Sequence, residues 1–269
     1  MKLLFLGDVV GRSGRQAICN EAKYLREKLN LDFLIVNVEN ATNGVGVTAT
    51  HSEDIIASGV DCLTLGDHAF DQKDMISHIE KSDRIVRPLN FSHKSPGDGF
   101  KVFKTKSGKK ILVVQLLGRV FMNRNFDDPF AAIDTLLLKF RLGHNIDIII
   151  VDMHAEATSE KMALGHYLDG RVSLVVGTHT HVPTADCQIL SKGTGYMTDL
   201  GMCGDYNSVI GMEIEEPISR FTTGVNRSRF MPAADTATLC GIFVEFDKLG
   251  ATTKINPIKY GGKIGDEIV

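Results

Sequence analysis

The sequence predicts an α/β protein in which two mixed β-sheets lie between outer layers of helices, as a four-layer α/β/β/α sandwich. Three observations predict it. Short apolar runs rich in branched residues recur from the N-terminus, and helical patterns lie between several of them. From Gln188 onward, apolar runs are separated by turn residues without a convincing helical pattern. Alternating strands and helices favour a partly parallel sheet, whereas the C-terminal runs favour antiparallel strands.

The predicted strands are continuous apolar runs, which suit strands that are buried on both faces. In chain order they are residues 3–6, 33–38, 62–65, 111–117, 146–151 and 174–176. Beyond them, the runs QIL, GYMTDLG, ATLCGIFVEFD and TTKINPIKY are expected to form meandering antiparallel strands.

Five segments have a helical pattern: residues 14–29, 50–58, 74–81, 129–142 and 159–168. The second begins with a capping box, Thr50-x-x-Glu53, and Gly59 stands where a C-terminal cap is expected. Ser159 is the expected N-cap of the last one. Residues 202–234 lack a clear period and are punctuated by glycine and proline, and we expect a long loop that is functional or mobile.

Composition limits the class of protein. With 269 residues, of which 43% are hydrophobic, the chain can bury one substantial core, and we expect a single domain over residues 1–269. The net charge of -3 gives no global field for nucleic acid or an anionic membrane, so an anionic substrate must be attracted locally. Scattered cysteines without a CxxC pair argue against disulfides and thiolate zinc sites. Without an apolar stretch of about 20 residues, a soluble cytoplasmic protein is expected.

Metal-ligand residue types follow the apolar runs at the points where the predicted strands end. They are Asp8, Glu39, Asn40, Asp67, His68, His154, His179 and His181. Because the carboxyl ends of parallel strands meet at one edge of a sheet, we expect these side chains to lie close together. The pair of histidines in GTHTH is the strongest single signal, since two imidazoles beside a buried strand indicate a ligand.

Carboxylates and imidazoles without thiolates suit iron, manganese, zinc or cobalt. The candidates outnumber the ligands that one tetrahedral ion needs, which indicates two ions. In such sites the ions share a bridging carboxylate and acidify a water molecule into a nucleophile, and Glu39 is the expected bridge. The other histidines are expected to be surface or capping residues: His51, His78, His93, His144 and His166.

The order of these motifs resembles the calcineurin-like metallophosphoesterases. It runs GD (7–8), EN (39–40), GDHxxD (66–71), His154 and GTHTH (177–181). The segments GDVVGRSGR, NVENATNG, DMHAEATSEK and GTHTHVPTAD further resemble the YmdB-type bacterial phosphodiesterases, over almost the whole chain. The resemblance implies the calcineurin-like fold and hydrolysis of phosphodiesters, including 2',3'-cyclic nucleotides.

The resemblance also implies a role for each candidate. One metal would be held by Asp8, Glu39 and His181, with Asn40 nearby as a further ligand or as a donor to one. The other would be held by Glu39, Asp67, His154 and His179. His68 would be the general acid on the leaving oxygen. Asp71 either orients the His68 ring or caps the helix expected around Asp74.

Two positions depart from the patterns that carry the resemblance. Val10 stands where the wider superfamily has a histidine, so the first metal has one ligand fewer. Asp67 stands where the closer family has asparagine. Two divalent ions (+4) with Asp8, Glu39 and Asp67 (-3) give a net charge of +1 instead of +2. We therefore expect tighter metal binding, a weaker pull on phosphate and reduced turnover.

The expected reaction is hydrolysis of a small phosphodiester by in-line attack of a metal-bridging hydroxide, with His68 protonating the departing alkoxide. The expected ions are iron or manganese, with zinc as an alternative. Two other functions stay open: a phosphomonoesterase or nucleotidase with the same metals, and a regulatory protein that binds a nucleotide with negligible turnover. The partner is a small phosphoester or nucleotide, and homo-oligomerisation is left open. A dinucleotide site fails because Gly7, Gly11 and Gly14 do not give GxGxxG.

Overall fold

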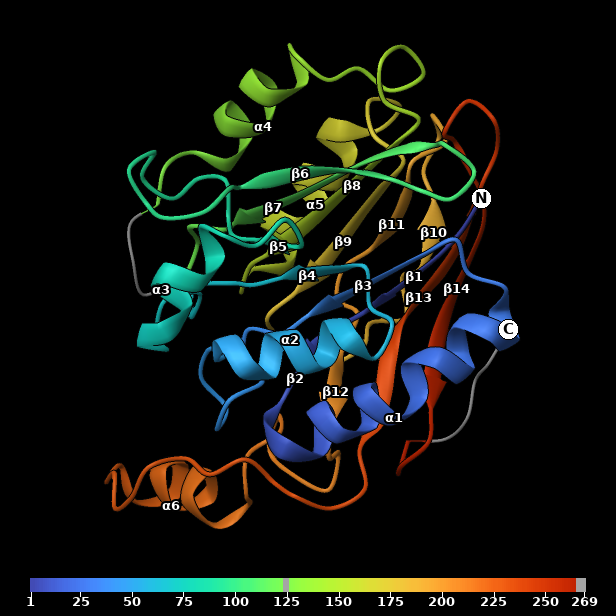
Figure 1. Cartoon of the computed structure of the whole chain (residues 1–269). Helices are drawn as coiled ribbons and strands as arrows, with labels where there is room; N and C mark the ends of the chain where they lie inside the picture. Colours follow the sequence, from blue (N-terminus) through green and yellow to red (C-terminus); the bar gives the residue numbers. More distant parts are fainter. Residues whose placement is uncertain (123–125, 265–269) are drawn as a thin grey trace.

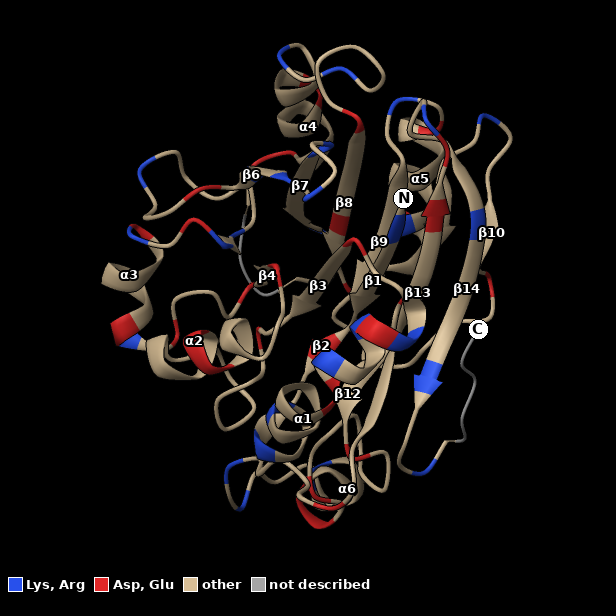
Figure 2. Cartoon of the chain, turned by 45° about the vertical axis from the view of Figure 1, so that its right-hand side comes forward, with Lys and Arg blue, Asp and Glu red and all other residues tan. Residues whose placement is uncertain are grey.

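Two mixed β-sheets pack face to face, and helices cover both outer faces (Figure 1). The structure, a computed structural model, describes residues 1–122 and 126–264. None of the helices in these two ranges has the length and apolar character needed to cross a membrane. Acidic and basic residues are interspersed over the helices and loops of the face shown in Figure 2.

The first sheet has the strand order β2-β12-β13-β1-β3-β4-β5, and β14 pairs with β13. Its strands are β1 (Lys2–Leu6), β2 (Asp8–Val9), β3 (Phe33–Asn37), β4 (Cys62–Thr64), β5 (Ile85–Val86), β12 (Met202–Gly204), β13 (Thr238–Phe246) and β14 (Thr252–Tyr260). The run from β1 through β3 and β4 to β5 is parallel. β13 is antiparallel to both β1 and β14, as predicted for the last two apolar runs, whereas the run GYMTDLG was wrongly expected to be only antiparallel, because its strand pairs in parallel within the second sheet.

The second sheet has the strand order β10-β11-β9-β8-β7-β6. Its strands are β6 (Phe100–Lys104), β7 (Lys110–Leu117), β8 (Ile148–His154), β9 (Leu174–Thr178), β10 (Gln188–Ile189) and β11 (Gly195–Met197). The central strands β7, β8, β9 and β11 are parallel, and the two edge strands pair antiparallel to their neighbours. The parallel carboxyl ends of both sheets therefore carry the residues that follow β3, β4, β8 and β9.

Three apolar layers separate the sheets and helices, because strand side chains alternate between the two faces. Leu4 and Leu6 of β1 face α1 (Gly11–Leu29), α2 (Ala49–Ala57) and α3 (Lys73–Ile79). Leu3 and Phe5 point the other way, into the layer between the sheets. On the second sheet, Leu112 packs toward α4 (Pro129–Leu137) and α5 (Thr158–Leu168). This arrangement confirms the predicted α/β/β/α sandwich.

Residues 202–234 contain more regular structure than predicted. They begin with β12 and include α6 (Glu215–Thr223), which lies apart from the other helices at the base of Figure 1. The expectation of a loop without a helix was therefore wrong. Pro217 obscured the helix, but it lies in the first turn, where a backbone N–H has no helical partner. Glu215 and Glu216 at the start and Arg220 in the last turn suit the helix dipole.

Several predicted helix boundaries were also wrong, and α1 begins at Gly11 instead of residue 14. The hydroxyl of Thr48, not Thr50, caps α2 by accepting from the backbone N–H of His51 at 3.3 Å. α5 begins at Thr158 after Ala157, whose side chain makes no cap, so Ser159 lies inside the helix. The helix predicted over residues 129–142 ends at Leu137. Gly59 has a φ of 107° directly after the C-cap of α2, as expected for a glycine that ends a helix.

Candidate metal centre

The candidate ligands meet where the carboxyl ends of the two sheets face each other. Asp8 in β2, Glu39 after β3 and Asp67 after β4 come from the first sheet. His154 ends β8, and His179 and His181 follow β9 of the second sheet. The carboxylates thus come from one sheet and the imidazoles from the other. The predicted convergence of these six side chains is what the structure shows.

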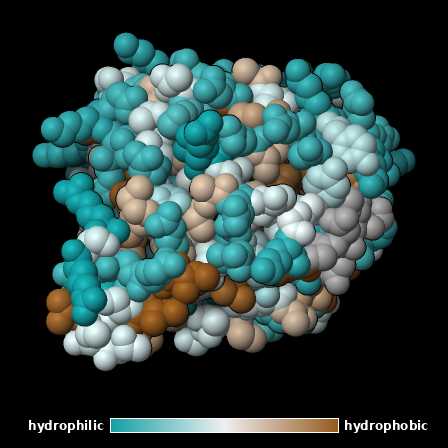
Figure 3. Space-filling model, turned by 90° about the horizontal axis from the view of Figure 1, so that it is seen from below, coloured by the Kyte–Doolittle hydropathy of each residue, from teal (hydrophilic) through white to brown (hydrophobic). Residues whose placement is uncertain are grey.

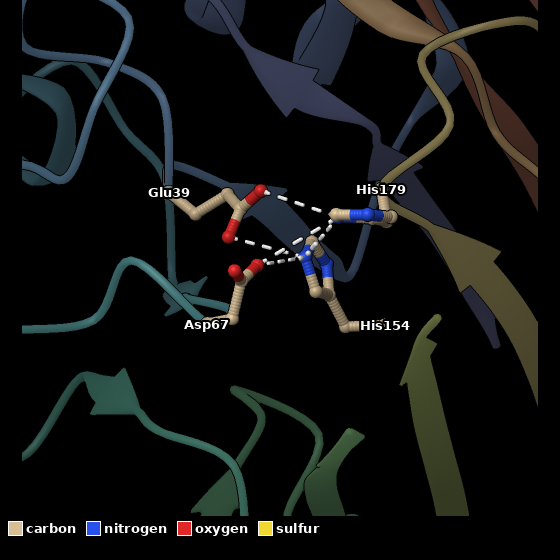
Figure 4. Close-up of side chains that lie close together, drawn as sticks. All are labelled: Glu39, Asp67, His154 and His179. Carbon is tan, nitrogen blue, oxygen red and sulfur yellow. Dashed lines mark hydrogen bonds and ion pairs between the residues drawn. The ribbon is translucent and has the colours of Figure 1, made fainter. Parts of the chain in front are cut away.

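The six side chains form two groups that share one carboxylate. Glu39, Asp67, His154 and His179 make the first group, and Asp8, Glu39 and His181 make the second. Within each group, one candidate ligand atom per residue lies within 4.8 Å of every other. Nε2 of His154 is 3.1 Å from Glu39 Oε2 and 3.3 Å from Asp67 Oδ1 (Figure 4). Glu39 is therefore the carboxylate that belongs to both groups.

Gly66 makes the close approach of these groups sterically feasible. A Cβ atom at this position would lie 1.9 Å from Glu39 Oε2 and 2.7 Å from His154 Nε2. Real Cβ atoms do not tolerate such contacts, so another residue would push the first group apart. The glycine before Asp67 is thus required by the geometry of the site.

The turn that carries the two later histidines is strained. His179 has a φ of 96° and His181 a φ of 65°, values that side-chain-bearing residues adopt rarely. Thr180 between them donates its hydroxyl to Asp199 Oδ2 at 2.6 Å, and its backbone N–H donates to the same oxygen at 3.2 Å. Asp199 is paired at 2.7 Å with Lys161, and both side chains are fully buried. This buried ion pair fixes the strained turn.

A chain of hydrogen bonds defines the proton position on His154. Thr178 Oγ1 donates to Asp152 Oδ1 at 2.7 Å, so its hydroxyl proton is committed. His154 Nδ1 lies 2.8 Å from the same hydroxyl and must therefore donate to it. The neutral imidazole then has no proton on Nε2, which faces Glu39 and Asp67. A lone pair is thereby directed to the centre of the first group.

Asp152 is fully buried, and donors from both sheets surround it. Besides Thr178, its carboxylate accepts from Thr64 at 2.7 Å, Gln115 at 2.9 Å and Asn37 at 3.3 Å. Burial raises the pKa of Asp152, while the charge of His154 and these hydrogen bonds act against the rise. A buried carboxylate with this set of donors is well satisfied.

The ring of His181 is likewise oriented by its neighbours, here Ile210 and Asn40. Its Nδ1 lies 2.7 Å from the carbonyl oxygen of Ile210 and donates to it. Its Nε2 lies 3.1 Å from Asn40 Oδ1, while the amide nitrogen of Asn40 donates to Gly44 O at 3.0 Å. With Nδ1 protonated, Nε2 and Asn40 Oδ1 present lone pairs to each other. Asn40 thus faces the second group, as expected for a further ligand.

The donor set fits cations. In both groups, unprotonated ring nitrogens face carboxylate or amide oxygens at 3.1–3.3 Å, so lone pairs converge with no proton between them. Asp8 Oδ1 and Glu39 Oε2 are buried and have no hydrogen-bond partner. Buried acceptors of this kind are rare in folded proteins unless a cation satisfies them. Oxygen and imidazole ligands without a thiolate suit first-row transition metals.

Burial and the short distances between charged groups also shift the pKa values of the candidate ligands. Burial raises the pKa of Asp8 to about 7. Burial and the neighbouring charge of His154 lower the pKa of His179 to about 4. For His154, burial acts to lower the pKa, but the negative charge of Glu39 and the neighbouring carboxylate oxygens of Asp67 and Glu39 raise it well above its usual value. The carboxylates around His154 thus favour positive charge at the centre of the first group.

His68 lies beside the two groups without belonging to either of them. Its Nδ1 is 2.7 Å from Asp71 Oδ2, which makes Asp71 its orienting partner and not a helix cap. Burial acts to lower the pKa of His68, but the charges of Glu39 and Asp67 and the hydrogen bond with Asp71 raise it. The ring lines a cavity of about 500 Å³ that also includes Glu39, His179 and His181.

Several residues of the site were missed from the sequence. Asp152, Thr178 and Asp199 contact candidate ligands or the turn between them, and Glu156 Oε2 lies 3.3 Å from His179 Nε2. Asp152 had a signal, since it is a charged residue inside the otherwise apolar strand IIIVDMH. The role of Asp199 had none, because it depends on a contact across the fold.

Comparison with known proteins identifies the family. The family model described as "YmdB-like protein" matches residues 4–258. This chain belongs to the YmdB-like family. The resemblance seen in the motifs is thereby confirmed for nearly the whole chain.

Two relatives support this assignment, and a third structure is similar in fold alone. A 2',3'-cyclic-nucleotide 2'-phosphodiesterase of Bacillus subtilis is 44% identical over 247 residues, covering 92% of each chain. A phosphatase structure from Mycoplasma pneumoniae superposes with a TM-score of 0.89 at 39% identity, covering 97% of this chain and 93% of that one. A 5'-nucleotidase precursor from Thermus thermophilus shares the fold alone, with a TM-score of 0.57 at 12% identity over 96% of this chain and 54% of that one.

Proposed function

We propose that this YmdB-like chain is a two-metal phosphodiesterase that hydrolyses small phosphodiesters, with 2',3'-cyclic nucleotides as the preferred class. The observation that carries the proposal is the pair of ligand groups joined by Glu39, in which lone pairs converge without protons. The name of the Bacillus subtilis relative supports the choice of substrate.

Asp8, Glu39 and His181, with Asn40, would hold one ion, and Glu39, Asp67, His154 and His179 the other. Ions bound there supply neutralisation of phosphoryl oxygens and acidification of water. We propose iron or manganese, with zinc as the alternative, because the donors are carboxylates, imidazoles and an amide. The single domain over residues 1–269 and the cytoplasmic location stay predictions. Homo-oligomerisation is left open.

His68 completes the reaction as general acid. When the bond between phosphorus and the leaving oxygen breaks, the ring proton of His68 goes to that oxygen and yields an alcohol. His68 suits this task because the surrounding carboxylates raise its pKa and so favour the protonated ring. Asp71 accepts from Nδ1 and leaves Nε2 to deliver the proton. The histidine then regains a proton from solvent.

The test is an assay of protein loaded with manganese or iron on 2',3'-cyclic AMP and bis-p-nitrophenyl phosphate. We expect turnover of both and loss of most of it in His68→Ala, with metal content unchanged. A matched control is His93→Ala, which removes an exposed histidine outside the site. Absence of turnover on both substrates with two ions bound would refute the proposal. Faster hydrolysis of monoesters than of diesters would favour a phosphomonoesterase instead.

A further inference from the structure

The cavity that opens on the candidate ligands has a second, apolar part. Its polar part carries His68, His179 and His181. Residues 202–234 contribute three apolar side chains to the lining, Ile210, Met212 and Phe230, which we call the apolar wall. A phosphate group alone needs only the polar part, so the apolar wall calls for a second portion of the substrate.

The apolar wall is exposed. Phe230 exposes 43% of its surface and Ile210 exposes 53%. Ile210 has a positive φ of 48°, and its carbonyl oxygen accepts from His181 Nδ1, so the backbone there is held at the site. Exposed apolar side chains that line a pocket are typical of ligand-binding sites, where a few polar groups set the orientation.

The ring of Phe230 is held in place before any ligand binds. The guanidinium carbon of Arg220 lies 3.7 Å from the ring centroid, a cation–π contact. Arg220 in turn donates to Glu216 Oε1 at 2.8 Å and to the carbonyl oxygen of Ser228 at 2.6 Å. A ligand that packs on a fixed ring does not have to order it, which favours binding.

We infer that the apolar wall binds the base of a nucleotide substrate, with Phe230 as the stacking platform. The inference rests on the proposed function, because the phosphate must lie at the ligand groups of the same cavity. A nucleobase is flat with apolar faces, and aromatic side chains stack on such faces without regard to sequence. The cavity volume of about 500 Å³ lies in the range that accepts drug-sized ligands, to which a mononucleotide belongs.

The side chains of the apolar wall define the expected selectivity. Ile210, Met212 and Phe230 carry no N–H or O–H group, so they cannot read the edge of a base. Stacking increases with ring area. The apolar wall therefore favours purine over pyrimidine 2',3'-cyclic nucleotides and does not itself distinguish adenine from guanine.

A neighbouring apolar surface on α6 supplies a control residue. It also suggests a competing role for Phe230, contact between two copies of the chain. Apolar side chains gather at the lower left of the face in Figure 3, and α6 exposes Ile218 and Phe221. Phe221 is 88% exposed and does not line the cavity. If Phe230 served contact between two copies of the chain, substitution of either phenylalanine would alter self-association.

The experiment compares Phe230→Ala with the matched control Phe221→Ala in the manganese-loaded protein. The substrates are 2',3'-cyclic AMP and glycerol 1,2-cyclic phosphate, which has the strained ring but no base. For Phe230→Ala, kcat/KM on the nucleotide falls about 5- to 150-fold more than on the base-free diester, chiefly through KM. Phe221→Ala keeps the wild-type ratio between the two substrates.

The other outcomes distinguish failure of the inference from failure of the proposed function. An unchanged substrate ratio in Phe230→Ala overturns the inference and leaves the proposed function standing. If the wild-type protein hydrolyses neither diester, the proposed function fails, and calorimetric binding of adenosine 3'-monophosphate then decides the inference. Weaker binding by Phe230→Ala than by Phe221→Ala upholds it, and equal binding overturns it. Altered sedimentation of Phe230→Ala with wild-type nucleotide affinity also overturns it.

Discussion

The hydroxyl of Thr178 lies 2.8 Å from Nδ1 of His154 and directs its own proton to Asp152. A threonine thus links a buried carboxylate to a candidate metal ligand. The link determines which nitrogen of the imidazole keeps its lone pair, and it is independent of which ions bind.

Thr178→Val tests this link. Because valine cannot accept from Nδ1, we expect zinc affinity to fall about 10- to 100-fold. Loss of one donor to buried Asp152 should also lower the free energy of unfolding by about 1–3 kcal/mol. Thr178→Ser is the matched control, since it keeps the hydroxyl, and it should recover zinc affinity. Calorimetric titration showing wild-type zinc affinity for the valine variant would contradict the assignment.

Asp67→Asn tests the charge of the site. Asparagine removes one negative charge, so the pull on phosphate should increase and metal affinity should decrease. With saturating manganese we expect higher kcat than in the wild type. Asp83→Asn, which changes an exposed aspartate outside the site, is the control. A fall in kcat at full metal occupancy would count against the charge argument.

Asp71→Asn tests the pH dependence of the general acid. Asp71 is one of the carboxylates that raise the pKa of His68, so its removal should lower that pKa. Because the acid form of His68 donates the proton, activity is lost as pH rises through its pKa. The alkaline limb of kcat against pH should therefore move to lower pH, while Asp83→Asn keeps the wild-type profile. A limb that stays in place would exclude His68 as the group that titrates.

Metal affinity itself should depend on pH near neutrality. In the metal-free protein, Asp8 has a pKa of about 7 because of burial, so below this value an ion must displace a proton. Above pH 7 the carboxylate is already ionised. We expect tighter manganese binding at pH 8 than at pH 6, with more protons released at pH 6. Calorimetry in two buffers of different ionisation enthalpy measures both, and equal affinity at the two pH values would contradict this reasoning.

Most of the strands and the positions of the ligand residue types could be predicted because both are local signals, whereas the short strands β2, β5 and β12 and the edge strand β6 were missed. Continuous apolar runs mark buried strands, and a polar residue directly after such a run lies at the edge of the sheet. Glu39 after β3 and His154 at the end of β8 are examples. Parallel strand direction then brings distant residues together without further information.

Other features depend on contacts that the sequence does not encode locally. Thr48 and Thr50 are equivalent as candidate caps, and only the backbone path selects Thr48. The helix α6 was obscured by Pro217, which is harmful in a helix interior but tolerated in a first turn. Thr178 resembles any threonine at a strand end until Asp152 is seen beside it.

Carboxylates from one sheet and imidazoles from the other have a consequence for the folded state. Ions held between them would join the two sheets as an additional cross-link. The free energy of unfolding should then rise with metal concentration by RT ln(1 + [M]/Kd), about 2.7 kcal/mol at 100 times Kd. Chelation should lower the melting temperature reversibly, and Asp8→Ala or His179→Ala should reduce that response. Metal would then serve as part of the architecture as well as the chemistry.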